Sequence, residues 1–247
     1  MDLFDYMRET NKEKESPLAS RMRPVTLDEV VGQKHIIGKD KLLYRAIKAD
    51  KLSSLIFYGP PGTGKTTLAK VIAHTTSAEF KQINATVAGK KDMEEVVKEA
   101  KDLQGMYGKK TILFIDEINC VSETLAPMML QFLQGKTFGN QKVPEGWVIV
   151  TAGNPPEYNK SVREFDVVTL DRIKRIDVQP DFEVWKEYAY EQGIHPAVIS
   201  YLELRRKNFY RMENTVDGRI FATARGWEDL SRLIQVYEIL GKEVDRE

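Results

Sequence analysis

Residues 59–66 read Gly59-Pro60-Pro61-Gly62-Thr63-Gly64-Lys65-Thr66, which fits the phosphate-loop pattern G-x-x-x-x-G-K-S/T at every fixed position. The apolar run 54–58 before it predicts a buried strand, and residues 67–73 after it carry apolar side chains at helical spacing. Glycines let backbone N–H groups surround phosphate oxygens, and the following helix adds its positive N-terminal end. We therefore predict that Lys65 reaches the outer phosphates of a nucleotide and that Thr66 ligates Mg²⁺. The alternative is a Gly/Pro-rich turn without a ligand.

Composition limits the classes of protein to consider. The 247 residues are 42% hydrophobic and 30% charged, enough for one large domain with a smaller companion. Lys plus Arg and Asp plus Glu both number 37, so the net charge is zero. Nucleic acid could then bind only through a local basic patch, because the chain as a whole has no positive field. Cys120 is the single cysteine, which excludes an intrachain disulfide. Residues 1–16 are polar and no apolar run approaches the ~20 residues of a membrane span, which predicts a cytoplasmic chain.

Two further polar groups follow predicted strands. Residues 111–115 are mostly apolar and end in Asp116 and Glu117, the pattern of a buried parallel strand with acids at its carboxyl end. Open α/β sheets bind ligands at that edge, so we predict that Asp116 holds Mg²⁺ through water and that Glu117 activates a water. Asn154 ends the run 147–154 at the same edge, where we predict that it orients the water. Capping of the turn before Pro155 is the alternative role for Asn154.

The segment before the first helix allows two interpretations. Thr26 and Glu29 have the spacing of a capping box, and Gly32 ends the turn. One interpretation is a helical preface to the domain. The other is a collar around an adenine base, to which Val30 and Val31 supply apolar contacts.

Periodicity and breaking residues predict an α/β part followed by a helical part. The remaining predicted elements are a strand over 80–84, a turn followed by a last short strand within 169–178, and a hairpin over 135–143 whose tip is Gly139-Asn140. The predicted helices are 41–49, 91–103 (broken by Gly105 and Gly108), 122–133 (capped by Ser122), 182–190, 196–206 and 225–240. We expect a mobile arm over 1–16, an α/β nucleotide-binding domain over 17–180 with helices on both faces of a parallel sheet, and a small all-helical lid over 181–247.

Together these residues resemble AAA+ P-loop NTPases over essentially the whole chain, with two branches represented. Residues 1–118 resemble the RarA/MgsA family of replication-associated recombination ATPases, through residues 17–24, 29–33 and 57–69. That family continues after its acidic pair with Ile-His-Arg-Phe-Asn-Lys, whereas this chain reads Ile118-Asn119-Cys120-Val121-Ser122. Residues 116–247 resemble MoxR-like ATPases, through the hairpin and the segments 151–156, 170–172 and 222–227. A fusion of two AAA+ genes explains this pattern, and a divergent single lineage is the alternative.

The resemblance implies roles for individual residues and a homo-oligomeric ring that works on a protein client or DNA. The residues implied to bind ATP are Val30, Val31, Gly59, Pro60, Pro61, Gly62, Thr63, Gly64, Lys65, Thr66, Thr67 and Arg225, the last resembling the sensor-two arginine. Thr66 and Asp116 are implied to hold Mg²⁺. The residues implied to act in hydrolysis are Glu117, which polarises water, Asn154, which resembles the sensor-one residue, and Arg172, which resembles the arginine finger. Arg163 and Arg175 are the alternatives for the finger, and Asn84 resembles the polar switch that holds Glu117 inactive.

The sequence leaves four functional interpretations to compare. The leading one is an ATP-hydrolysing machine that remodels a macromolecular partner as MoxR-like proteins do. The alternative is a RarA-like or clamp-loader-like DNA-dependent ATPase of replication-associated recombination and repair. A small-molecule kinase is disfavoured by the implied water-activating Glu117 and by the sensor and finger residues. An inactive fusion product is the fourth reading.

Overall fold

A sheet of five parallel strands forms the centre of the larger unit. The computed structural model describes residues 24–138, 141–158, 162, 165, 173–215 and 218–242. The strands are β1 (Leu55–Tyr58), β2 (Glu79–Asn84), β3 (Thr111–Asp116), β6 (Val148–Gly153) and β7 (Lys174–Asp177), in the order β2-β3-β6-β1-β7. Because β6 separates β1 from β3, the chain reverses its direction of winding beside β1, and such reversals open ligand crevices at the carboxyl ends of strands.

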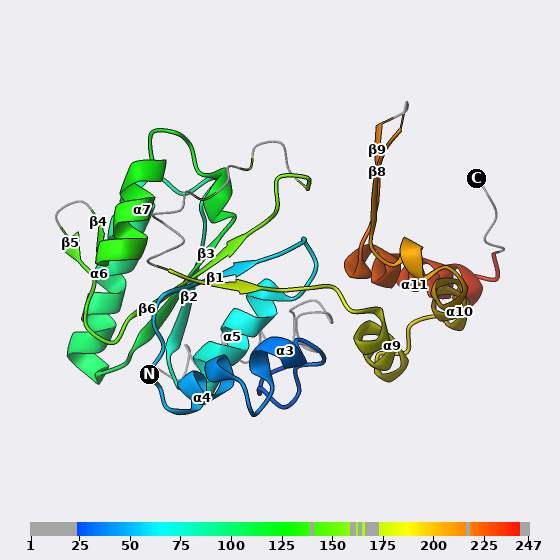
Figure 1. Ribbon diagram of the computed structural model, residues 1–247, viewed down its shortest axis with the longest axis horizontal. Coiled ribbons are helices and arrows are strands. Elements are labelled where there is room, and N and C mark those ends of the chain that lie inside the picture. Colours follow the sequence, from blue (N-terminus) through cyan, green and yellow to red (C-terminus); the bar gives the residue numbers. More distant parts are fainter. Residues whose placement is uncertain are drawn as a thin grey trace.

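Successive side chains of a strand point to opposite faces of the sheet. Helices pack on both of these faces (Figure 1). Ile112 and Phe114 of β3 belong to the core beneath α3 (Lys34–Ile37), α4 (Leu42–Lys48) and α5 (Lys65–Thr75). Leu113 and Ile115 belong to the core beneath α6 (Lys90–Tyr107) and α7 (Ala126–Gly135). The predicted parallel sheet sandwiched by helices is thus confirmed.

Three local predictions differ from the structure. Helix α6 continues through Gly105 to Tyr107 and ends at Gly108, whose φ is 61°. A glycine inside a helix costs only ~1 kcal/mol, which the packing of the buried face of α6 exceeds. Helix α7 begins at Ala126 rather than near Ser122, whose carbonyl accepts from the Ala126 N–H in the preceding turn. The Glu29 carboxylate does accept from Thr26 Oγ1 at 2.8 Å, but residues 26–29 form bends and turns rather than a helix.

The predicted hairpin before β6 is present as β4 (Thr137–Phe138) and β5 (Gln141–Lys142), which pair antiparallel. Its tip, 139–140, lies outside the described residues, as does the predicted arm 1–16. Within the described ranges, no helix is both long and apolar enough to cross a bilayer.

The C-terminal unit consists of helices and one hairpin (Figure 1). Its elements are α9 (Phe182–Glu191), α10 (Pro196–Leu204), the 3-10 turn η2 (Arg206–Asn208), β8 (Arg211–Thr215), β9 (Gly218–Ala222) and α11 (Ala224–Ile239). The helices agree with the predicted helical region, and Trp185, Leu202 and Phe209 are buried between them. The antiparallel β8–β9 hairpin, which projects from the helices, was not predicted.

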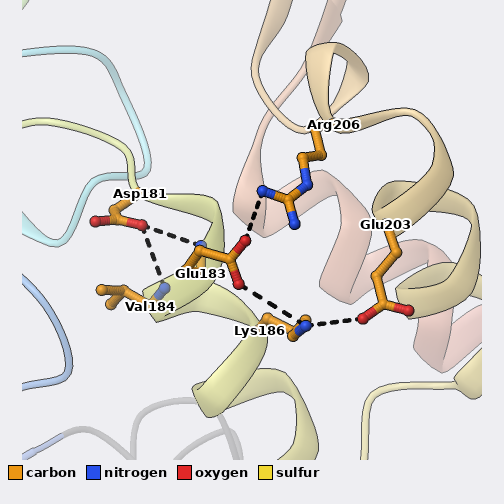
Figure 2. Close-up of polar contacts among 6 residues, drawn as sticks. All are labelled: Asp181, Glu183, Val184, Lys186, Glu203 and Arg206. Atoms are coloured by element: carbon orange, nitrogen blue, oxygen red, sulfur yellow. Dashed lines mark hydrogen bonds and ion pairs between the residues drawn. The ribbon is translucent and has the colours of Figure 1, made fainter.

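Polar side chains connect α9 to the elements that follow it (Figure 2). Asp181 starts α9 by accepting from two backbone N–H groups of its first turn, the nearer at 3.0 Å. Lys186 bonds Glu203 of α10 at 2.8 Å, and Glu183 pairs with Arg206 of η2 at 2.6 Å. Exposed ion pairs of this kind contribute little individually, so the apolar core is the main source of stability in this unit.

The core assignment predicts the effect of shortening one buried leucine. Leu113→Ala removes a fully buried side chain from β3 and should lower the free energy of unfolding by about 2–5 kcal/mol. Leu42→Ala, at a position with 72% exposure, is the matched control and should change it by less than about 0.5 kcal/mol. Urea unfolding followed by circular dichroism measures both, and equal effects would contradict the assignment.

Candidate functional site

The phosphate loop connects β1 to α5, as its sequence predicts. Gly62 and Gly64 have φ of 81° and 84°, backbone conformations that a side chain would strain. At Gly59 the reason for glycine is different, because an added Cβ would lie 2.0 Å from the carbonyl oxygen of Val178, the residue that follows the neighbouring strand β7. Thr63 Oγ1 donates to the Pro60 carbonyl at 2.8 Å and closes the loop.

Lys65 is buried at the centre of this loop with all three of its N–H donors in use. Its Nζ donates to the carbonyls of Gly59 at 2.7 Å and Pro60 at 2.6 Å, and to Asn154 Oδ1 at 2.9 Å. The pKa of Lys65 is lowered to about 8, chiefly by burial, against the opposing charge of Asp116 and with a smaller lowering by the charge of Arg225. Because all three N–H donors of Lys65 are engaged, a phosphate can bind the ammonium group only if it replaces at least one of the three acceptors.

The two acids lie at the carboxyl end of β3, facing the same cavity as the loop. Burial and the neighbouring charge of Glu117 raise the pKa of Asp116, against the opposing effects of the Glu117 backbone N–H and of Lys65. A cation close to Asp116 would offset this burial of a carboxylate. Asp116 and Thr66 are oxygen ligands of the kind that Mg²⁺ takes together with phosphates and waters. Among the described residues, no group of three or more His, Cys, Asp or Glu lies together as a metal site.

Asn84, at the end of β2, reaches the second acid. Its Nδ2 donates to Glu117 Oε2 at 3.3 Å, and its Oδ1 accepts from the Thr86 N–H at 2.9 Å and the Thr86 hydroxyl at 2.7 Å. The two bonds to Thr86 fix the orientation of the Asn84 amide, so that its donor faces the carboxylate. Glu117 itself has a φ of 54°, a left-handed conformation that is uncommon for a residue with a side chain.

A cavity of about 1230 Å³ joins these groups to the N-terminal segment and to the C-terminal unit. Val30 and Val31 line it, as do Val184 and Tyr188 of α9. The side chain of Gln33 fixes this arrangement, because its Nε2 donates to the Gln179 carbonyl at 2.7 Å. The apolar lining fits the predicted collar around a base, and the phosphate loop lies on the same cavity.

The C-terminal unit contacts the phosphate loop directly. The Tyr210 hydroxyl donates to the Pro61 carbonyl, and burial raises the pKa of this phenol. Arg225, in the first turn of α11, lines the cavity, as the resemblance implies for a sensor-two arginine. The contacts of Gln33 and Tyr210 were missed in the sequence analysis. A single polar or aromatic residue in a loop has no spacing signal, and both partners lie 146 or more positions away in the chain.

The structure thus brings together most of the predicted site residues and leaves others outside. Those that line the cavity are Val30, Val31, Pro61, Gly62, Thr63, Gly64, Lys65, Thr66, Thr67, Asn84, Asp116, Glu117, Asn154 and Arg225. Gly59 and Pro60 contribute through their carbonyls to Lys65. Arg172 and Arg163 lie outside the described residues. Arg175 bonds Asp177 at 2.7 Å and lies over the Tyr58 ring, so its own chain already engages its guanidinium.

A parallel sheet with a phosphate loop after β1, acids at the end of β3 and an amide directly after β6 is a P-loop fold of the AAA type. Residues 55–172 match the family model described as "ATPase family associated with various cellular activities (AAA)". The match begins at the first residue of β1.

Curated relatives carry the name "Replication-associated recombination protein A". The protein of that name from Coxiella burnetii is 52% identical over 103 residues, which are 42% of this chain and 23% of the relative. The one from Bacillus subtilis is 43% identical over 118 residues, 48% of this chain and 27% of the relative. The chain therefore spans about a quarter of the length of these relatives.

Solved structures extend the similarity of fold to most of the chain. RuvB of Thermotoga maritima superposes with a TM-score of 0.63 at 20% identity, covering 90% of this chain and 69% of that one. A structure titled "Structural Basis for Katanin Self-Assembly" superposes with a TM-score of 0.55 at 21% identity, covering 89% of this chain and 73% of that one. At these identities the likeness concerns the fold alone.

The contacts of Lys65 predict its contribution to nucleotide binding. Lys65→Ala removes the ammonium group of the phosphate loop and should weaken Mg-ATP binding by about 10-fold to 100-fold or more, the scale of a charge-assisted hydrogen bond. Lys70→Ala is the control, because Lys70 lies on the same helix with its ammonium over the Phe80 ring. Titration calorimetry measures both affinities, and an unchanged affinity in Lys65→Ala would contradict the assignment.

Proposed function

We propose that this chain hydrolyses ATP with Mg²⁺ in the cavity between its two units. The observation that carries the proposal is the convergence of four strand ends, through Lys65, Asn84, Asp116–Glu117 and Asn154, on one cavity. Phosphoryl transfer to water needs little covalent chemistry from a protein, and depends on positioning and on neutralisation of charge. The described site supplies groups that position the reactants and groups that neutralise charge.

Each residue then has a distinct task. The backbone N–H groups of the loop and the Lys65 ammonium bind the phosphates, and Lys65 gives up one of its present acceptors to do so. Thr66 and Asp116 hold Mg²⁺, which neutralises phosphate charge when bound. Glu117 accepts hydrogen bonds from the attacking water and polarises it, and Asn154 orients that water. Arg225 reaches the phosphates from the C-terminal unit, and Val30 and Val31 contact the base.

The Asn84–Glu117 contact defines a resting state for this site. While Glu117 Oε2 accepts from the Asn84 amide at 3.3 Å, that oxygen is engaged by a donor other than water. Release of Asn84 would free the carboxylate for the attacking water. The proposed switch therefore consists of one hydrogen bond between the ends of neighbouring strands β2 and β3.

We further propose that the ATPase is linked to DNA, in the manner of a replication-associated recombination ATPase. The names of the relatives support this second reading of the sequence over the MoxR-like remodelling that the sequence analysis placed first. The matched lengths of 103 and 118 residues are also close to that of residues 1–118, where the sequence resembles this family. The fusion with a MoxR-like part stays a prediction.

A ring of identical subunits remains part of the proposal. The Arg172 guanidinium would complete the site of a neighbouring copy and neutralise transition-state charge there. Arg175 is a weaker candidate for that role, because it is already held by Asp177 and Tyr58 within its own chain.

The role of Glu117 predicts a separation of binding from chemistry. Glu117→Gln keeps the size of the side chain but removes the carboxylate, so Mg-ATP affinity should persist while turnover falls by about 10²-fold or more. Glu187→Gln, on the exposed side of α9, should keep wild-type turnover. Phosphate release under saturating ATP measures the rates, and near-normal turnover in Glu117→Gln would remove Glu117 from the proposed chemistry.

The link to DNA predicts how turnover responds to nucleic acid and salt. Single-stranded or double-stranded DNA should raise the ATPase rate, and the increase should fall steeply between about 50 mM and 200 mM salt, because phosphate contacts release counterions. The rate without DNA, measured over the same salt range, is the control and should change much less. Turnover that DNA does not alter at low salt would favour remodelling of a protein partner instead.

A further inference from the structure

Asn119 is a buried polar residue beside the proposed site, and it has no role in the proposed function as described so far. It lies in η1 (Ile118–Cys120), directly after the acidic pair, and its exposure is 5%. Its Nδ2 donates to the Asn154 carbonyl at 2.7 Å, and its Oδ1 accepts from the Asn154 N–H at 3.3 Å. Both hydrogen bonds therefore go to the main chain of one residue.

The Asn154 backbone needs such a partner because strand β6 ends one residue earlier, at Gly153. Beyond the last ladder position, where Gly153 lies opposite Tyr58, the main-chain N–H and C=O of Asn154 must find acceptors and donors elsewhere. A carboxamide presents one donor and one acceptor side by side, which matches the N–H and C=O of a single residue. A carboxylate offers only acceptors and an aliphatic side chain offers neither, so the pairing selects an amide.

The packing around this pair leaves little room for another arrangement. A Cβ added at Gly153 would lie 3.2 Å from Phe165, 3.3 Å from Tyr58 and 3.4 Å from Asn119 Oδ1. The absence of a side chain at Gly153 thus permits the close approach of Asn119 to the end of β6.

Asn119 adds a connection between two parts of the site, the ends of the neighbouring strands β3 and β6. It follows Glu117 by two residues, in a turn closed by the Cys120 N–H donating to the Glu117 carbonyl at 2.8 Å. Through Asn154 the connection continues to Lys65, whose Nζ donates to Asn154 Oδ1. When a phosphate replaces that acceptor, the Asn154 side chain loses its contact with Lys65, and the two bonds from Asn119 still fix its main chain.

We propose that Asn119 is a positioning residue for ATP hydrolysis, which holds the Asn154 main chain so that the Asn154 amide faces the attacking water. The inference rests on the proposed function. It assigns Asn119 no contact with ATP, so its loss should affect the rate of chemistry and leave nucleotide binding nearly unchanged.

The test is a double-mutant cycle with Asn119→Ala and Asn154→Ala, read as kcat and KM for ATP. Asn119→Ala should lower kcat by about 10-fold or more, because a displaced group of this kind can cost ~10²-fold, with KM within about 3-fold of wild type. In the Asn154→Ala background the same change should alter kcat by less than about 2-fold, because residues that act through one another are not additive. Ser122→Ala, an exposed position in the same connection, should keep the wild-type kcat.

A merely structural role for Asn119 would give a different result. In that case kcat would fall by the same factor in both backgrounds, or KM would rise with it, and either result would overturn the inference. If circular dichroism shows that Asn119→Ala is unfolded, Asn119→Asp takes its place in the cycle. This variant keeps the acceptor for the Asn154 N–H and loses the donor, so its kcat should be lowered with the same non-additivity.

A wild-type chain without turnover would overturn the proposed function and this inference together. Wild-type kcat in either Asn119 variant of an active chain would overturn the inference alone.

Discussion

The site depends on the buried Lys65 ammonium, whose hydrogen bonds within the described part of the chain go to oxygens of uncharged groups. A charge removed from water costs several kcal/mol unless hydrogen bonds replace its hydration. Lys65 obtains those bonds from two loop carbonyls and from the side chain of Asn154. This requirement constrains the path of the phosphate loop, and it also ties the loop after β1 to Asn154, which directly follows β6. The same charge attracts phosphate, so the group whose burial needs compensation is also the one that would bind the ligand.

The sheet brings the remaining groups within reach of Lys65. Parallel strands end at a common edge, where β2 ends in Asn84, β3 ends in Asp116 and Asn154 directly follows β6. The C-terminal unit covers this edge through Tyr210, whose hydroxyl bonds the Pro61 carbonyl, and through Arg225. A ligand in the cavity would therefore contact both units, which gives the site a physical means of coupling nucleotide occupancy to the position of the helical unit.

Much of the fold could be predicted because its signals are local. The apolar run of β3 is buried on both faces, and α6 shows helical spacing in Met93, Val97 and Ala100. The errors occurred where a local signal competed with packing. Gly105 does not end α6, because the buried face continues to favour the helix, and Ser122 does not begin α7. The β8–β9 hairpin was missed because its sequence, 211–222, has no clear alternation of apolar and polar residues.

The sequence by itself determined the phosphate loop, the strands that surround it and the acids that follow β3. These features depend on glycine conformation and on side-chain periods of 2 and 3.6 residues, which neighbouring positions encode. Only the tertiary structure decided which polar groups meet. Asn84 reaches Glu117 across 33 positions, Asn119 reaches Asn154 across 35, and Tyr210 reaches Pro61 across 149. The physical reason is that a hydrogen bond between distant residues follows from strand order and from the packing of helices on the sheet, and no local spacing in the chain specifies either.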